Sequence, residues 1–170
     1  MSADGGNGRE GYGEQLRSTL SSFHVWFRFI EFDEPVKTVE QASKKVQAEK
    51  IAKSIVMIDS QGQPLLAVVS AMVMVSHKKL KELLSVRDVR LANAQEVLQY
   101  SGYPVGGVPP YNKISRVLLD QQLLGFETVI VGGGDINKLV EIRTKDIVTA
   151  LHPIIADISK TQASNLTKGK

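Results

Sequence analysis

The chain has 170 residues, of which 42% are hydrophobic and 23% charged, with a net charge of +3. These values fit one soluble globular domain with a buried core, and they exclude fibrous and globally disordered proteins. The absence of cysteine excludes disulfides, thiolate metal ligands and a cysteine nucleophile, and it fits a reducing compartment, so we expect a cytoplasmic protein. The small positive charge favours an anionic partner such as nucleic acid without identifying one.

The composition of the two ends differs from that of the middle of the chain. Residues 1–13 contain five glycines and few apolar side chains, and residues 159–170 are similarly polar. Such segments cannot repay the entropy of ordering, so we expect a flexible tail at each end and one domain over residues 14–158. The longest nearly apolar run, residues 64–75, is shorter than the roughly 20 residues of a membrane span, and the first residues lack the apolar core of a signal peptide.

The first half of the domain predicts two helices, a strand and a hairpin. Residues 16–32 are apolar and aromatic, and we expect a helix over about 16–23 followed by a strand over 25–29. Thr38 and Gln41 form a capping-box pattern that predicts a helix to about residue 49. The apolar runs 54–59 and 64–71 flank a short glycine-containing segment, which predicts a β-hairpin of two central strands.

The second half mixes helices and strands. Ser76 is expected to cap a helix that runs to residue 84, and Asn93 with Glu96 predicts a helix to about residue 100. We expect strands near 114–119, 128–131 and 139–142, and a last helix capped by Thr144. Because helices and strands do not alternate regularly, the pattern indicates the α+β class rather than a doubly wound parallel sheet.

The segment GYPVGGVPPYNK, residues 102–113, contains three glycines and three prolines. Gly106 and Gly107 would let the backbone approach a ligand that any Cβ would obstruct, and the prolines would hold that backbone in place. A purely structural turn between a helix and a strand favours the same residues. The loop alone therefore leaves a binding role and a structural role open.

Two further positions also have two interpretations. The Gly-Gly-Gly-Asp run at 132–135 follows an apolar strand but lacks the spacing of a P-loop or of a dinucleotide-binding fold, so it predicts a tight turn whose backbone could line a pocket. Asp120 ends a predicted strand, where its carboxylate would either cap the next turn or orient a pocket.

Lys53 stands at the start of a predicted central strand, where burying an unpaired ammonium is costly. Its side chain either extends to solvent or acts as a fixed cation facing an ester carbonyl or a phosphate. The three histidines are scattered and the GxSxG signature is absent, so no metal, cofactor or familiar nucleophile is indicated. An enzyme with this sequence would act by positioning and electrostatics.

Five segments in order change the interpretation: TVEQA (38–42), IAKSIV (51–56), SGYPVGGVPP (101–110), LLD (118–120) and VGGGD (131–135). Together they resemble the YbaK/ProX family of aminoacyl-tRNA deacylases, which is related to the editing insertion of bacterial prolyl-tRNA synthetases. The resemblance covers about residues 35–157, and the lysine before a strand and the GYxxGGxxP loop are its most specific parts. It implies a compact single domain with a curved, barrel-like mixed β-sheet flanked by helices.

The resemblance also implies a free-standing editing enzyme that hydrolyses the ester of a small non-cognate amino acid, of the Cys or Ala class, on tRNA, with tRNA(Pro) expected. The family's lysine falls on Lys53 and its GxxxP loop on Gly106 through Pro110, so Lys53 and Gly106 are the predicted catalytic residues. With backbone amides around Gly106 and Gly107, Lys53 would stabilise the negative charge on the ester oxygen. The predicted substrate-binding residues are Gly102, Tyr103, Gly107, Val108, Pro110, Asp120, Gly132 and Gly133.

The nucleophile implied by the resemblance is either a water helped by the terminal ribose hydroxyl or, for cysteine, the substrate's own thiol. This chain has Leu139 where some cysteine-specific members carry an acidic residue, and Gly132 where relatives often have a polar one. The amino acid therefore stays open, as does a synthetase partner, and a monomer is the default. A noncatalytic module that binds an aminoacyl group, nucleotide or RNA is one alternative, and a small-molecule esterase is another.

Overall fold

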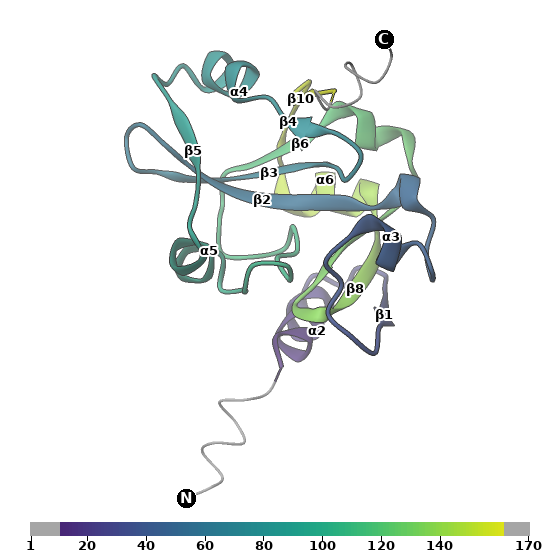
Figure 1. Ribbon diagram of the computed structural model, residues 1–170. Helices are drawn as coiled ribbons and strands as arrows, with labels where there is room; N and C mark the ends of the chain where they lie inside the picture. Colours follow the sequence, from purple (N-terminus) through teal and green to yellow (C-terminus); the bar gives the residue numbers. More distant parts are fainter. Residues whose placement is uncertain (1–10, 162–170) are drawn as a thin grey trace, which may run out of the picture.

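A computed structural model describes residues 11–161, and its largest sheet is built around a β-hairpin (Figure 1). This sheet has five strands in the order β5-β2-β3-β6-β9. At its centre, β2 (Ala52–Asp59) pairs antiparallel with β3 (Pro64–Ser70), and β5 (Val89–Leu91) pairs antiparallel with β2. On the other side, β6 (Val117–Asp120) runs parallel to β3, and β9 (Ile154–Ala156) runs parallel to β6. The predicted hairpin is confirmed, and the sheet is mixed.

A second sheet is antiparallel and has the order β1-β8-β7. It contains β1 (Phe27–Glu31), β7 (Thr128–Gly133) and β8 (Asp135–Arg143), while β4 (Met74–Val75) and β10 (Ser159–Lys160) form a small third sheet. A parallel bridge between Ile51 and Ile130 brings the start of β2 next to β7. Within residues 11–161 the strands form three sheets without closing into one, so the expected barrel-like sheet is not confirmed.

The helices begin at the predicted caps in most cases. They are α2 (Tyr12–Ser22), α3 (Val39–Ala42), α4 (His77–Leu84), α5 (Ala94–Ser101) and α6 (Thr144–Leu151), with short 3-10 turns η1 (Ala48–Lys50) and η2 (Gln121–Gly125). Both predicted capping boxes are present, at Thr38 and at Asn93, and the Ser76 hydroxyl accepts the Lys79 N–H at 3.2 Å. These side chains satisfy backbone donors that helix starts leave without partners.

Two predicted helices require correction. The helix expected over 38–49 ends at Ala42 and the chain continues through turns to η1. Between Ala42 and η1 the segment has only Val46 as an apolar residue, which is too little tertiary packing to stabilise further helical turns. At the last helix, Arg143 is the N-cap residue and Thr144 is the first helical residue, with its hydroxyl buried and unpartnered within residues 11–161.

The domain boundaries also extend slightly beyond those expected. Helix α2 begins at Tyr12, and β10 includes Ser159 and Lys160, so both elements reach into the segments expected as tails. The remainder of those two segments, residues 1–10 and 162–170, lies outside the described residues.

One main apolar core joins the two larger sheets. It contains Leu16 from α2, Val68 from β3, Val131 from β7 and Ile147 from α6, each of which is fully buried. Since helices and both sheets share this core, the described residues form a single α+β domain. In that part of the chain the apolar stretches of the helices are too short for any of them to span a bilayer.

Candidate functional site

A pocket of about 260 Å³ opens where the start of β2, the loop after α5 and the β7–β8 turn converge. It brings together four of the residues predicted from the sequence, although they come from three distant segments. The pocket is lined by Val36, Lys37, Thr38, Val39, Ala42, Ile51, Ala52, Lys53, Ser54, Gly106, Val108, Gly132 and Leu139. No Asp or Glu is among these residues, so the charged groups of the wall are cations.

Lys53 is the second residue of β2, paired with Val69 on β3, and its side chain is partly buried. Burial lowers the pKa of its ammonium from the usual 10.5, because desolvation disfavours the charged form. Within residues 11–161 no carboxylate lies within ion-pair distance of Lys53. A partly desolvated cation without a protein counter-ion is suited to binding an anion or a developing negative charge.

The loop that carries Gly106 is a tight turn closed by its own backbone. The Gly107 N–H donates to the Pro104 carbonyl at 3.0 Å, and Gly106 has a φ of +91°. A positive φ at the third position of such a turn requires glycine. The Gly107 amide, expected as a donor to substrate, is thus already used, whereas the N–H groups of Gly106 and Val108 donate to no acceptor within residues 11–161.

The neighbouring glycines allow two backbones to touch. A Cβ on Gly107 would lie 1.9 Å from the Gly134 carbonyl oxygen, and a Cβ on Gly132 would lie 2.5 Å from the Val108 carbonyl oxygen. The Gly134 N–H donates to the Gly107 carbonyl at 2.8 Å. The loop and the β7–β8 turn therefore pack backbone against backbone, which no residue with a side chain would permit.

The other predicted binding residues do not line the pocket. Gly102 is the left-handed C-cap of α5 with φ +84°, Tyr103 is 2% exposed in the main core, and Pro110 is buried. A Cβ on Gly133 would lie 2.8 Å from the Lys138 backbone. These residues shape the loop and the turn that present Gly106, Val108 and Gly132.

Asp120 neither caps the next turn nor lines the pocket, the two roles considered from the sequence. Its side chain makes no capping hydrogen bond to η2, and it is fully buried away from the residues that line the pocket. One carboxylate oxygen accepts the Ile158 N–H at 3.2 Å, which fastens the segment before β10 to the end of β6.

Sequence reasoning missed much of the pocket wall. The apolar residues Val36 and Val39 and the hydroxyl of Ser54 line it. The Ser54 hydroxyl oxygen is buried without a hydrogen-bond partner in the described part of the chain. Ser54 could have been found from the sequence, since it is a polar residue directly after Lys53 in an otherwise apolar strand. Buried hydroxyls normally have hydrogen-bond partners, so a serine at such a position indicates a partner such as a ligand.

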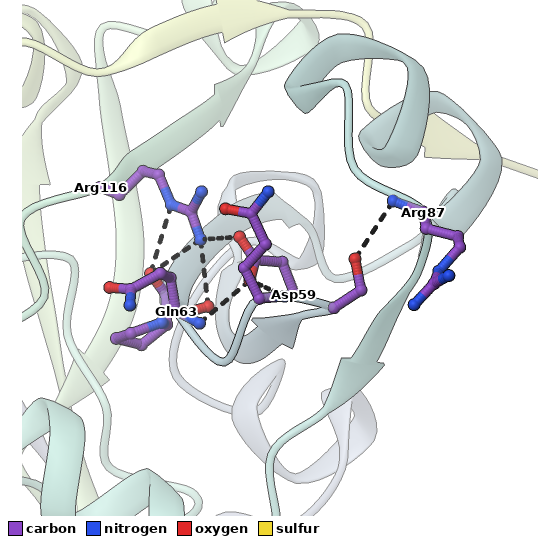
Figure 2. A network of polar contacts seen from close by, with 7 residues as sticks. Asp59, Gln63, Arg87 and Arg116 are labelled. Atoms are coloured by element: carbon purple, nitrogen blue, oxygen red, sulfur yellow. Dashed lines mark hydrogen bonds and ion pairs between the residues drawn. The ribbon is translucent and has the colours of Figure 1, made fainter.

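A second polar cluster lies at the opposite end of β2 (Figure 2). The Arg116 guanidinium donates to the buried Asp59 carboxylate at 2.9 Å and to the Gln63 carbonyl at 3.0 Å. Asp59 is six residues from Lys53, about 20 Å along an extended strand. This pair fastens the hairpin and does not belong to the pocket. Among residues 11–161 no group of three or more His, Asp or Glu side chains could hold a metal ion.

Comparison with known proteins identifies the family. The aminoacyl-tRNA editing domain family matches residues 33–150. The uncharacterised protein YwhH of Bacillus subtilis is 30% identical over 139 residues, which cover 78% of this chain and 88% of that protein. The proline–tRNA ligase of Thermotoga neapolitana is 30% identical over 100 residues, 58% of this chain but only 17% of the ligase. The chain thus corresponds to a small part of that enzyme.

Solved structures agree with the fold. The crystal structure of the hypothetical protein APE2540 has a TM-score of 0.79 and 30% identity, and the match covers 86% of this chain and 99% of that one. A structure described as a candidate trans-editing enzyme for prolyl-tRNA synthetase has a TM-score of 0.78 at 24% identity, covering 88% of this chain and 97% of that one. With the family match over most of the domain, these similarities show that the chain belongs to the aminoacyl-tRNA editing domain family.

Proposed function

We propose that this protein is an aminoacyl-tRNA deacylase that hydrolyses the ester between a small amino acid and the terminal adenosine of tRNA. The observation that carries the proposal is the Lys53 ammonium, which is partly buried without a carboxylate partner in the pocket that also contains Gly106. Membership of the editing domain family supports the reaction class and a tRNA substrate.

In the proposed reaction a water molecule is the nucleophile, and the two protein groups act by stabilising charge. Water adds to the carbonyl carbon, and negative charge builds on the carbonyl oxygen. The Lys53 ammonium and the Gly106 N–H are the proposed donors to that oxygen, and one such donor is typically worth about 10² to 10³ in rate. The bond to the ribose oxygen then breaks, and a proton from water passes to that oxygen, which releases the amino acid and uncharged tRNA.

The apolar wall limits the amino acid. Val36, Val39 and Leu139 line the same pocket as Lys53, and this apolar lining supports alanyl and cysteinyl esters as the proposed substrates. Excluding a larger cognate residue by steric clash is easier than separating two small ones, which differ by only about 1 to 3 kcal/mol per methylene. The similarity to a proline–tRNA ligase supports tRNA(Pro) as the carrier, with the protein acting in trans on its acceptor end.

The test is multiple-turnover release of amino acid from alanyl-, cysteinyl-, seryl- and prolyl-tRNA(Pro), with free amino-acid esters as a parallel panel. We expect turnover on alanyl- or cysteinyl-tRNA(Pro), little on prolyl-tRNA(Pro), and much slower cleavage of the free esters. Protection of the charged tRNA without turnover would overturn the proposal in favour of a binding module. Equal cleavage of free esters and charged tRNA would overturn it in favour of a small-molecule esterase.

A further inference from the structure

The Gly132–Gly134 turn is pressed between the pocket loop on one side and the first turn of helix α2 on the other. A Cβ on Gly134 would lie 2.5 Å from the Tyr12 carbonyl oxygen, and Gly134 has a φ of +94°. On its other side Gly134 donates its N–H to the Gly107 carbonyl at 2.8 Å. Three backbone segments therefore stack in series from α2 to the pocket, and the middle one is the turn.

Asp135 fastens this stack. Its two carboxylate oxygens accept the Tyr12 N–H at 2.9 Å and the Gly13 N–H at 3.1 Å, which are free donors at the start of α2. The carboxylate oxygen that accepts the Gly13 N–H also lies 3.3 Å from the Lys138 ammonium nitrogen. A carboxylate at a helix N-terminus is favoured by the partial positive charge there. The residue that follows Gly134 is thus held to α2 by two charge-assisted hydrogen bonds, and its carboxylate also pairs with Lys138 of its own strand, β8.

Helix α2 also contacts the other end of the pocket loop. The Gln15 side-chain amide donates to the Gly102 carbonyl at 3.2 Å, and the Tyr12 and Tyr103 rings lie 6.1 Å apart. Leu16 and Leu20 anchor the helix in the main core with no exposed surface. In Figure 1 the helix lies beside β8 at the lower edge of the domain. α2 precedes the segment matched by the family, residues 33–150, yet it contacts the elements that build the site.

We propose that Asp135 is a positioning residue for the pocket: by fixing the start of α2 to the β7–β8 turn, it holds the Gly107 backbone and thereby the Gly106 amide beside Lys53. Asp135 does not line the pocket, so it acts through the turn and not on substrate. Its effect on catalysis rests on the proposed deacylase function, whereas its effect on the loop does not. Since small misplacements of catalytic groups cost up to about 10²-fold in rate, loosening this clamp lowers turnover.

The test compares Asp135→Ala with Asp135→Asn and with Asp157→Ala. Asp157 is a matched control, because it also joins a lysine, at 2.9 Å to Lys79, and a backbone N–H, that of Ser159 at 3.4 Å, in a region away from the pocket. Steady-state deacylation gives kcat and KM separately. Hydrogen exchange at the Gly134 and Gly107 amides reports the loop directly, whether or not the protein is active.

We expect Asp135→Ala to lower kcat about tenfold with KM within about twofold, and to accelerate exchange at both glycine amides. Asp135→Asn keeps one of the two acceptor oxygens, so its kcat should lie between those of Asp135→Ala and wild type, about threefold below wild type. Asp157→Ala should leave kcat and exchange at both amides unchanged. If Asp135→Ala does not fold, a threefold lower kcat and faster exchange in Asp135→Asn support the proposal. Unchanged exchange at the Gly134 and Gly107 amides in folded Asp135→Ala, or in Asp135→Asn where the alanine variant does not fold, would overturn the proposal. An inactive wild type with accelerated exchange in the variant would instead overturn the deacylase function and leave the clamp standing.

Discussion

Lys53 combines a positive charge with partial burial, and this combination has a cost for the fold. Burial lowers the pKa of its ammonium, and no carboxylate within residues 11–161 compensates for the lost hydration. A charge that destabilises the folded protein and faces a pocket indicates a role in binding or catalysis rather than in stability. Removing this cation is therefore expected to impair the reaction without lowering the stability of the fold.

Lys53→Met should raise the midpoint of thermal unfolding and abolish deacylation, since methionine removes the desolvated charge while filling similar space. Because the pKa is lower in the folded protein, the unfolded chain binds more protons between the two pKa values, and wild-type stability rises with pH there. The difference in stability between the two proteins should thus be full below the lowered pKa of folded Lys53 and should close as the pH approaches the unfolded value of about 10. A methionine variant less stable than wild type at neutral pH would contradict this assignment.

Gly107 tests whether the backbone contact between loop and turn is obligatory. Gly107→Ala would place a Cβ 1.9 Å from the Gly134 carbonyl oxygen, so we expect a loss of about 3 kcal/mol in the free energy of unfolding, and inactivity in whatever remains folded. Gly125→Ala is the matched control, because nothing lies within 4 Å of its Cβ position. Urea unfolding of both variants measures the two free energies of unfolding. Similar losses for Gly107→Ala and Gly125→Ala would show that the turn can move to accommodate a Cβ, so that the backbone contact is not obligatory.

At the residue scale, the sequence allowed prediction of the pocket residues with distinctive chemistry. Lys53, Gly106 and Gly132 line the pocket as predicted. They could be recognised in the sequence because a lysine at the start of an apolar strand and adjacent glycines are unusual there. The positions of Val36 and Val39 in the pocket wall could not be predicted, because in the sequence a valine that lines a pocket cannot be distinguished from one that packs in the core. The sequence predicts that Tyr103 and Asp120 bind substrate, whereas the structure buries both side chains outside the pocket lining. This burial depends on long-range packing that no local pattern records.

At the scale of elements, the helix starts with capping side chains and the strands of the β2–β3 hairpin lie within two residues of their predicted positions, whereas the length of β8 was not predicted. The capping boxes at Thr38 and Asn93 start helices where expected. Strand β8 was expected over 139–142 and extends from Asp135 to Arg143, because β1 pairs along one of its edges and β7 along the other. Residues such as Asn137 have low strand propensity, so tertiary pairing decides their conformation.

The hairpin β2–β3, which carries Lys53, is fastened by the Asp59–Arg116 pair, and this predicts a pH dependence of stability. Burial alone would raise the pKa of the Asp59 carboxyl, but hydrogen bonds from the Gln63 N–H and from Arg116 outweigh it, so the pKa lies below its usual 3.8. A depressed pKa stabilises the fold above the unfolded value, about 3.9. That contribution is lost as pH falls through the lower folded value.

Arg116→Ala should lower the free energy of unfolding by about 3 kcal/mol at neutral pH, because it leaves a buried carboxylate without its cation. Its stability should also fall less steeply than that of wild type when the pH is lowered below about 4. Arg87→Ala provides the control: in Figure 2 no dashed line joins its guanidinium to Asp59, and its main-chain N–H, which alanine retains, donates to the Ser60 hydroxyl. Equal stability of the two alanine variants in urea unfolding would refute the role of the pair.

At the scale of the whole molecule, the site lies at a junction. Lys53 comes from the five-stranded sheet, Gly132 comes from the three-stranded sheet, and Gly106 and Val108 come from the connection between α5 and β6. Both sheets contribute to one apolar core. The α+β class could be predicted from the irregular order of helices and strands. The curved, barrel-like sheet implied by the resemblance is not confirmed within residues 11–161, and such an arrangement depends on which strand edges meet.

The shared core predicts that the domain unfolds as one unit. Far-ultraviolet circular dichroism and the fluorescence of Trp26, which contacts Arg143 at the start of α6, should give coincident transitions in urea, as expected for a two-state domain of this size. A separate early transition in one of these two signals would show that the two sheets unfold independently.

The most direct test of the central claim is single-turnover release of alanine from alanyl-tRNA(Pro), with enzyme in excess, for wild type and Lys53→Ala, both shown to be folded. A fast wild-type rate that falls about 10² to 10³-fold in the variant would establish that this cation stabilises the reacting ester. Equal rates for wild type and variant would contradict the role assigned to Lys53 and remove the observation on which the deacylase proposal depends.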